Sequence, residues 1–132
     1  AAALSGVGFS EVRGVELLPG LVDLAESCVG RLRQGHATGM LPEGQALPQM
    51  RILQGDMLEV DWSDADVIYL SSICFNEHLM RGLADKALQL KSGTRIITLK
   101  LFSRHMDQFE KIHEDWYKMS WGRICVHVIR RL

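Results

Sequence analysis

The chain has 132 residues, of which 47% are hydrophobic and 23% charged, with a net charge of −1. These values predict one globular domain, residues 1–132, and argue against a disordered or fibrous chain. Because no global basic field exists, direct nucleic-acid binding is not expected, and the basic stretch 123–131 is better explained as a solvated strand end. No apolar run reaches about 18 residues, so we expect no membrane segment and an intracellular location, nuclear or cytoplasmic.

The cysteines and histidines are dispersed along the chain. Cys28, Cys74 and Cys125 are odd in number and widely spaced, which argues against a disulfide framework or a metal-binding cysteine motif. Each lies in an apolar run, so we expect buried free thiols in a reducing compartment. No metal site is expected either from four of the five histidines, which are scattered along the chain: His78, His105, His113 and His127.

The first half of the chain alternates between strand and helix patterns. Residues 1–5 resemble the end of a helix closed by glycine, and the absence of an initial methionine suggests that further residues precede them. A short strand, 11–16, ends in an acid. Pro19 suits the first turn of a helix over 19–33. The apolar face of that helix is Val22, Ala25, Val29 and Leu32. Residues 34–49 are rich in glycine and proline and predict a loop or insertion.

The second half continues the alternation and ends differently. Strands are predicted over 51–54 and 66–70, each followed by small polar residues. Asn76 is the expected N-cap of a helix to about Leu90. A β-branched, central strand follows over 94–99. Residues 103–114 read as polar and weakly helical, and 116–130 as a hairpin around Trp121-Gly122. The predicted fold is α/β: a Rossmann-like, mostly parallel sheet with an antiparallel C-terminal hairpin.

Two acids follow successive strands of this predicted sheet. In parallel α/β sheets, ligands bind beyond the carboxyl ends of the strands. Glu16 stands where an acid can accept bonds from two ribose hydroxyls, although it could equally be a surface carboxylate. Asp56 could accept from an adenine amino group beside Met57, or could be the cap of a helix over residues 57–60. Together the acids favour a bound nucleoside. The glycine-rich turn that would cradle it, and the strand before that turn, would lie upstream of Ala1.

The residues after the later strands offer no nucleophile. Ser71 and Ser72 are not surrounded by a Gly-x-Ser-x-Gly elbow, so they are expected to donate hydrogen bonds or simply to end a strand. Lys100 and Phe102 follow the central strand, and a structural role is favoured for both.

These residues resemble the catalytic core of class I S-adenosylmethionine-dependent methyltransferases, and specifically the Dot1-like histone lysine methyltransferases. The matching segments occur in the family's order: GVELLPGLVDLAE at 14–26, Gly55-Asp56-Met57, VIYLSSICF at 67–75, Leu99-Lys100-Leu101-Phe102, Ser120-Trp121, and the strand ending at 127–131. The resemblance implies S-adenosylmethionine as cofactor and a protein substrate, possibly a histone. It implies cofactor binding by Glu16, Asp56, Met57 and Ser71, and it places Ser71 and Phe75 at the catalytic centre.

The sequence departs from the family at three positions. Ser71 replaces the first Asn of an Asn-Asn-Phe-Ala-Phe motif, Ile73 replaces its first Phe, and Cys125 replaces a channel tyrosine. These changes leave two alternatives to a lysine methyltransferase. One is a catalytically degenerate binding or assembly module, and the other is a methyltransferase acting on another protein side chain or on a small molecule. The oligomeric state is open.

Overall fold

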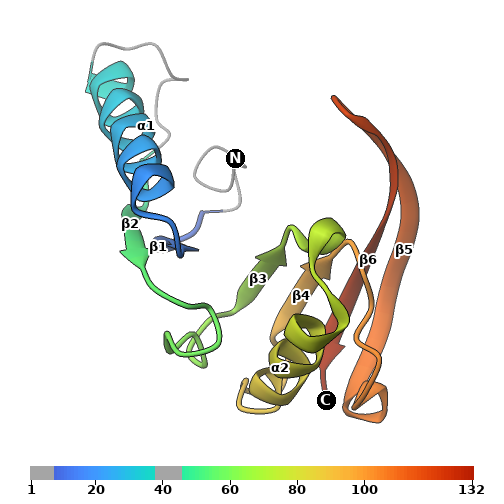
Figure 1. Ribbon diagram of the computed structural model, residues 1–132. Coiled ribbons are helices and arrows are strands. Elements are labelled where there is room, and N and C mark those ends of the chain that lie inside the picture. Colours follow the sequence, from blue (N-terminus) through green and yellow to red (C-terminus); the bar gives the residue numbers. More distant parts are fainter. Residues whose placement is uncertain (1–7, 38–45) are drawn as a thin grey trace. The chain divides into compact units, whose positions relative to one another are not determined.

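The computed structural model describes residues 8–37 and 46–132 (Figure 1). Contacts divide the chain into two compact units, Ala1–Val60 and Asp61–Leu132, and each has its own sheet. Strands β1 and β2 pair in the first unit, and the strand order in the second is β3-β4-β6-β5. The expected helix end over 1–5 and much of the expected loop over 34–49 lie outside the described residues.

The first unit consists of β1 (Glu11–Glu16), α1 (Pro19–Ala37) and β2 (Gln49–Gln54). The strands are parallel, with Glu11 opposite Gln49 and Glu16 opposite Gln54. Pro19 begins α1, as predicted. Val22 is buried, and the other predicted apolar-face residues are half-buried: Ala25, Val29 and Leu32. The predicted helix end at residue 33 was too early, because α1 continues to Ala37.

The second unit contains β3 (Val67–Leu70), η2 (Ser72–Cys74), α2 (Glu77–Ala87), β4 (Arg95–Thr98), η3 (Met106–Gln108), β5 (Phe109–Met119) and β6 (Gly122–Arg131). Strand β4 is central, as its apolar sequence predicted: it is parallel to β3 and antiparallel to β6. Strand β5 pairs antiparallel with β6 as a long hairpin. The α/β class is confirmed, and the described strands form two parallel and two antiparallel pairs.

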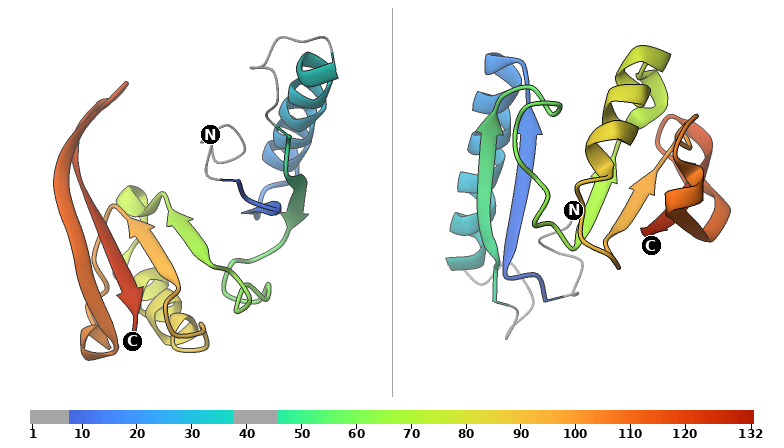
Figure 2. Two further views of the ribbon diagram at one scale, coloured as in Figure 1. Left: turned by 180° about the vertical axis from the view of Figure 1, so that it is seen from behind. Right: turned by 90° about the horizontal axis from the view of Figure 1, so that it is seen from below.

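Helix α2 packs on one face of the four-stranded sheet (Figure 2). Asn76 caps it as predicted, since its Oδ1 accepts a hydrogen bond of 2.9 Å from the backbone N–H of Leu79. The helix side chains buried in the core are Met80, Leu83, Ala84 and Ala87. The sheet contributes Ile96 from β4 and Ile129 from β6, which are 1% and 0% exposed. This core determines which side of the sheet each β4 and β6 side chain faces.

The prediction of weak helix over 103–114 is wrong. Only Met106–Gln108 forms a single 3-10 turn, and Phe109 begins the eleven-residue strand β5. The segment is polar in sequence, and almost every residue of β5 is solvent-exposed, so no apolar alternation marked it as a strand. Pairing with β6, which follows β5 after a two-residue turn, decides its conformation.

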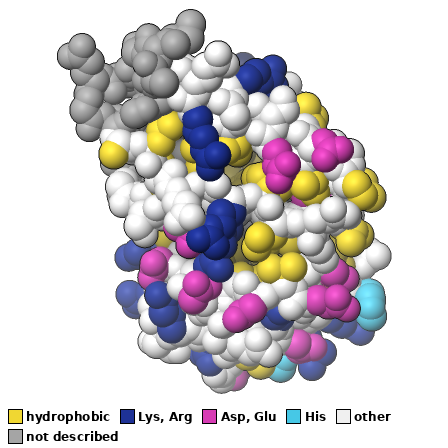
Figure 3. Space-filling model, turned by 90° about the vertical axis from the view of Figure 1, so that its left-hand side faces the viewer, with side chains coloured by type: hydrophobic (Ala, Val, Ile, Leu, Met, Phe, Trp, Pro, Cys, Tyr) yellow, Lys and Arg dark blue, Asp and Glu magenta, His cyan; other side chains and the backbone are white. Residues whose placement is uncertain are grey.

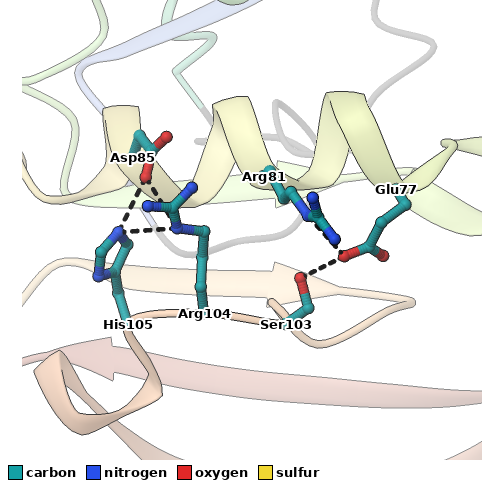
Figure 4. A network of polar contacts seen from close by, with 6 residues as sticks. All are labelled: Glu77, Arg81, Asp85, Ser103, Arg104 and His105. Atoms are coloured by element: carbon teal, nitrogen blue, oxygen red, sulfur yellow. Dashed lines mark hydrogen bonds and ion pairs between the residues drawn. The ribbon is translucent and has the colours of Figure 1, made fainter.

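Residues 103–105, which lead from β4 toward β5, are tied to α2 by a polar network (Figure 4). Glu77 Oε1 accepts from Arg81 Nε at 3.1 Å and from Ser103 Oγ at 2.6 Å. Further along the helix, Asp85 Oδ1 lies 3.2 Å from Arg104 Nε and 2.8 Å from His105 Nε2. Five of these six side chains are exposed and His105 is half-buried, so the network mainly positions the loop and each contact adds only a small amount of stability.

The cysteines are all free thiols. The expectation that they are buried is wrong for Cys28 and Cys74, which are exposed, and Cys125 is half-buried. Cys28 precedes the inward-facing Val29 on α1, and Cys74 lies in the turn η2, so an apolar run in sequence does not become a buried run at either place. Among the described helices, none combines the length and apolarity of a membrane-spanning segment.

Candidate functional site

Glu16 is the last residue of β1 and turns the chain toward α1. Its Oε1 accepts a hydrogen bond of 2.9 Å from the backbone N–H of Leu18. Leu18 O in turn accepts from the backbone N–H groups of Leu21 and Val22 at 3.0 and 3.1 Å, and so starts the helix. The half-buried carboxylate is therefore held at the strand end by one oxygen. Its second oxygen has the acceptor capacity that a ligand hydroxyl requires.

Asp56 caps the turn that follows β2. Its Oδ1 accepts from the backbone N–H of Leu58 at 2.8 Å, and its carbonyl accepts from the N–H groups of Glu59 and Val60, both at 2.9 Å. The capping role considered for the sequence is therefore present in the structure. Capping uses Oδ1, and a carboxylate has a second oxygen that can accept from a ligand. Met57 lies next to it and is half-buried.

The two acids share one edge of the β1–β2 sheet. Glu16 pairs with Gln54, and the backbone N–H of Gly55 donates to the carbonyl of Glu16 at 3.0 Å. Gly55 has a packing reason to be glycine, because a Cβ there would lie 2.8 Å from Cγ2 of Val60. Register and this backbone bond thus bring together the strand ends that carry Glu16 and Asp56, as the parallel pattern predicted.

In the second unit, two adjacent serines have different roles. Ser72 is completely buried. Its Oγ lies 2.9 Å from Thr98 Oγ1 and accepts from the backbone N–H groups of Leu99 at 3.2 Å and Lys100 at 3.0 Å. Ser71 is exposed at the start of η2, where its side chain makes no capping hydrogen bond. Ser72 therefore joins the carboxyl ends of β3 and β4, a role that sequence reasoning could not assign to one serine over the other.

Phe75 ends η2 and is half-buried. Its carbonyl oxygen accepts a hydrogen bond of 2.9 Å from Lys100 Nζ. The structural role favoured for Lys100 is thus observed: its ammonium group ties the chain after β4 to the chain after β3. Phe102 is 4% exposed and packs edge-on against Phe109, with ring centroids 5.6 Å apart, so it too is structural.

Cys125 lies on β6 opposite Trp116 of β5. Burial, followed by the nearby carboxylate of Glu114, raises the pKa of its thiol above the ordinary value. A thiol in this environment stays protonated at neutral pH. It is therefore not set up as a nucleophile.

A family model described as "Histone methylation protein DOT1" matches residues 2–120. The chain belongs to the DOT1 family. The match covers most of the chain and includes β1 to β5, so the expected family relationship is confirmed. It extends over Glu16, Asp56, Met57, Ser71 and Phe75, but it does not test what each of these residues does. A search of curated proteins found no match to the chain.

Comparison with solved structures supports the fold. The chain is similar to the crystal structure of a point mutant of MtNAS, with a TM-score of 0.58 and 16% identity over 92% of this chain. It covers 44% of that protein's length. Precorrin 8w decarboxylase of Methanobacterium thermoautotrophicum matches with a TM-score of 0.44 and 16% identity over 93% of this chain and 70% of that chain. The first likeness agrees with the predicted Rossmann-like α/β fold of the DOT1-family chain.

Proposed function

We propose that this DOT1-family chain forms the cofactor-binding part of an S-adenosylmethionine-dependent methyltransferase whose acceptor is a protein lysine. The observation that carries the proposal is the placement of Glu16 and Asp56 at adjoining carboxyl ends of parallel strands. Each carboxylate is oriented by one local backbone bond and has a second oxygen for a ligand. Membership of the DOT1 family supports the methyl-transfer chemistry.

The two acids suit different parts of the cofactor. Glu16, at the strand end, would accept from the two ribose hydroxyls, since a carboxylate can take both at once. Asp56 would accept from the adenine amino group, and Met57 would supply an apolar wall for the ring. When bound, S-adenosylmethionine supplies an electrophilic methyl group on a sulfonium.

The residues of the second unit would serve the acceptor. We assign Ser71 to the cofactor and acceptor, and Phe75 to the wall of the lysine entrance. Both stand at the start and end of η2, which Ser72 and Lys100 hold in place through their contacts with β4 and Phe75. An amine that arrives deprotonated needs no general base, so the contribution of these residues is alignment and exclusion of water.

The test is calorimetric titration of S-adenosylmethionine into the native protein that contains this chain. Glu16→Gln and Asp56→Asn remove the charges but keep an oxygen for the backbone bonds to Leu18 and Leu58. Glu59→Gln, an exposed acid of the same turn, is the matched control. We expect each site variant to weaken binding by at least about 10-fold, the loss of one charge-assisted hydrogen bond of about 1.5–3 kcal/mol. Equal binding by all four proteins would refute the assignment.

A binding module without catalysis is the second candidate. It is favoured by Ser71, which is exposed and does not cap η2, and by Cys125, whose raised pKa keeps it a neutral thiol. Transfer of radiolabelled methyl groups to histones separates the candidates. Cofactor binding without any transfer to histone, other protein or small-molecule acceptors would support the module.

The partner is proposed to be a histone or another nuclear or cytoplasmic protein. Lys and Arg side chains on the face drawn in Figure 3 are interspersed with acidic and hydrophobic ones. A face with this mixture of side chains is better suited to bind a protein partner than a nucleic acid, because binding to a phosphate backbone requires clustered positive charge.

A further inference from the structure

Three side chains that bind transition metals meet on the β5–β6 hairpin: Glu114 of β5, and Cys125 and His127 of β6. One ligand atom from each lies within 4.8 Å of the other two. The sequence concealed this cluster, because the glutamate is eleven residues from the cysteine and belongs to a segment that was expected to be helical. Only the antiparallel pairing of the two strands brings the three together.

Strand register explains the convergence. Glu114 is directly opposite His127, and Cys125 is two residues before His127 on the same strand. Side chains two residues apart point to the same face of a sheet, and directly opposed residues have Cβ atoms about 4.5–5.5 Å apart. The face is the one that carries Ile129 into the core beneath α2, so the two β6 ligands are partly covered: Cys125 is half-buried and the His127 side chain is 14% exposed.

Polar contacts within the cluster already orient the ligands. His127 Nδ1 lies 2.9 Å from Glu114 Oε2, and Lys111 Nζ lies 2.8 Å from the same oxygen. The Lys111 side chain is exposed, so an ion can take its place on one carboxylate oxygen while the ammonium contacts the other. Lys111 would then hydrogen-bond to the Glu114 oxygen that does not bind the metal, and so help to orient the carboxylate.

We propose that Glu114, Cys125 and His127 bind a divalent transition-metal ion, with zinc the best fit. Thiolate, imidazole and carboxylate are the three ligand types that zinc takes in proteins, and the softness of the thiolate disfavours magnesium and calcium. The Cys125 thiol is protonated before the ion binds, so binding releases its proton to solvent and the affinity rises with pH. Metal–ligand bonds of about 2.0–2.3 Å in a tetrahedral site place ligand atoms about 3.3–3.6 Å apart. The present separations are no more than 4.8 Å, so forming the site requires the ligand atoms to approach one another by at most about 1.5 Å.

Three protein ligands leave a fourth coordination position for water or an exogenous group. The site adjoins the edge where β4 ends, because His127 is also opposite Thr98, whose hydroxyl contacts Ser72. An ion here would therefore fasten the hairpin beside the carboxyl ends of β3 and β4. This inference does not depend on the proposed methyltransferase activity.

The experiment is titration of the folded chain with Co²⁺, followed by displacement with Zn²⁺. A thiolate ligand produces a sulfur-to-cobalt charge-transfer band in the near ultraviolet. We expect this band with one equivalent of cobalt, and its loss in Cys125→Ser. Loss of a residue that only hydrogen-bonds to a metal ligand already costs about 10–100-fold in metal affinity. Because His127 would be a direct ligand, we expect His127→Gln to bind cobalt at least about 100-fold more weakly. Glu114→Gln should weaken binding in the same direction.

Two controls are built into the chain. His113→Gln removes a neighbouring histidine that alternates to the other face of β5 and contacts the hydroxyl of Tyr117 at 2.9 Å. Cys74→Ser removes an exposed thiol outside the cluster. Binding that survives both controls supports the site. Absence of the charge-transfer band in the wild-type chain, or equal loss of binding in a control variant, would overturn it.

A second measurement needs no variant and so does not depend on a variant's folding. Zinc should slow alkylation of Cys125 by iodoacetamide, while Cys28 and Cys74 react as fast as before, as measured by peptide mass spectrometry. At least about a 10-fold slowing at Cys125 alone is expected for a site that holds the thiolate. Identical rates with and without zinc at Cys125 would refute the proposal.

Discussion

Replacement of Ser72 by alanine tests how the carboxyl ends of β3 and β4 are held together. Ser72 and Thr98 are both 0% exposed, so water cannot replace the lost hydroxyl. The backbone N–H of Leu99 would lose its acceptor, and that of Lys100 would keep only a contact of 3.4 Å to Thr98 Oγ1. An unsatisfied buried donor costs about 1–3 kcal/mol. For one lost and one weakened bond we expect a loss of about 2–4 kcal/mol in the free energy of unfolding.

The assay is urea unfolding followed by far-ultraviolet circular dichroism, and the control is Ser71→Ala. Ser71 is exposed and caps nothing, so its replacement should change stability by less than about 0.5 kcal/mol. The comparison uses the same substitution at adjacent residues, so composition and helix propensity cancel. An equal midpoint for the two variants at unchanged m-value would refute the structural role given to Ser72.

Four further substitutions test packing and charge. Leu83→Ala, at a fully buried position of α2, should cost about 2–5 kcal/mol in urea unfolding, and a loss below about 1 kcal/mol would contradict the core described for α2. Gly55→Ala should lower the free energy of unfolding by about 1–3 kcal/mol, because the new Cβ would lie 2.8 Å from Cγ2 of Val60. Gly30→Ala is the contrast: nothing lies within 4 Å of a Cβ at this position of α1, so the change should stabilise the protein by about 0.4–1 kcal/mol. A change of the same sign in both variants would disprove the packing argument. Hydrogen bonds from Ser103 and then Arg81 lower the pKa of Glu77 below 4.5, so its stabilising effect is present above that pH and is lost as the pH falls through the lowered value. The melting-temperature difference between wild type and Glu77→Gln should therefore shrink between about pH 6 and about pH 3, and a constant difference would argue against the network in Figure 4.

The sequence by itself determined the elements that are set by a few neighbouring residues. Strand β1 was predicted as a short strand ending in an acid. The start of α1 at Pro19 and the cap at Asn76 follow from fixed proline geometry and from a side-chain acceptor for the first helical N–H groups. The central position of β4 followed from its β-branched, apolar composition. The acids at the ends of β1 and β2 could be recognised as a pair because parallel strands present their carboxyl ends at one edge.

Only the folded structure decided features that depend on how one element pairs or packs with another. Pairing with β6 made residues 109–119 one strand, although the polar segment 103–114 was predicted to be weakly helical and the hairpin to begin only at Trp116, because backbone bonds to β6 outweigh weak local preference. The same pairing placed Glu114 beside Cys125 and His127, which no spacing along the chain reveals. Ser71 and Ser72 are identical in chemistry, and burial against Thr98 alone makes one of them structural and leaves the other at the surface.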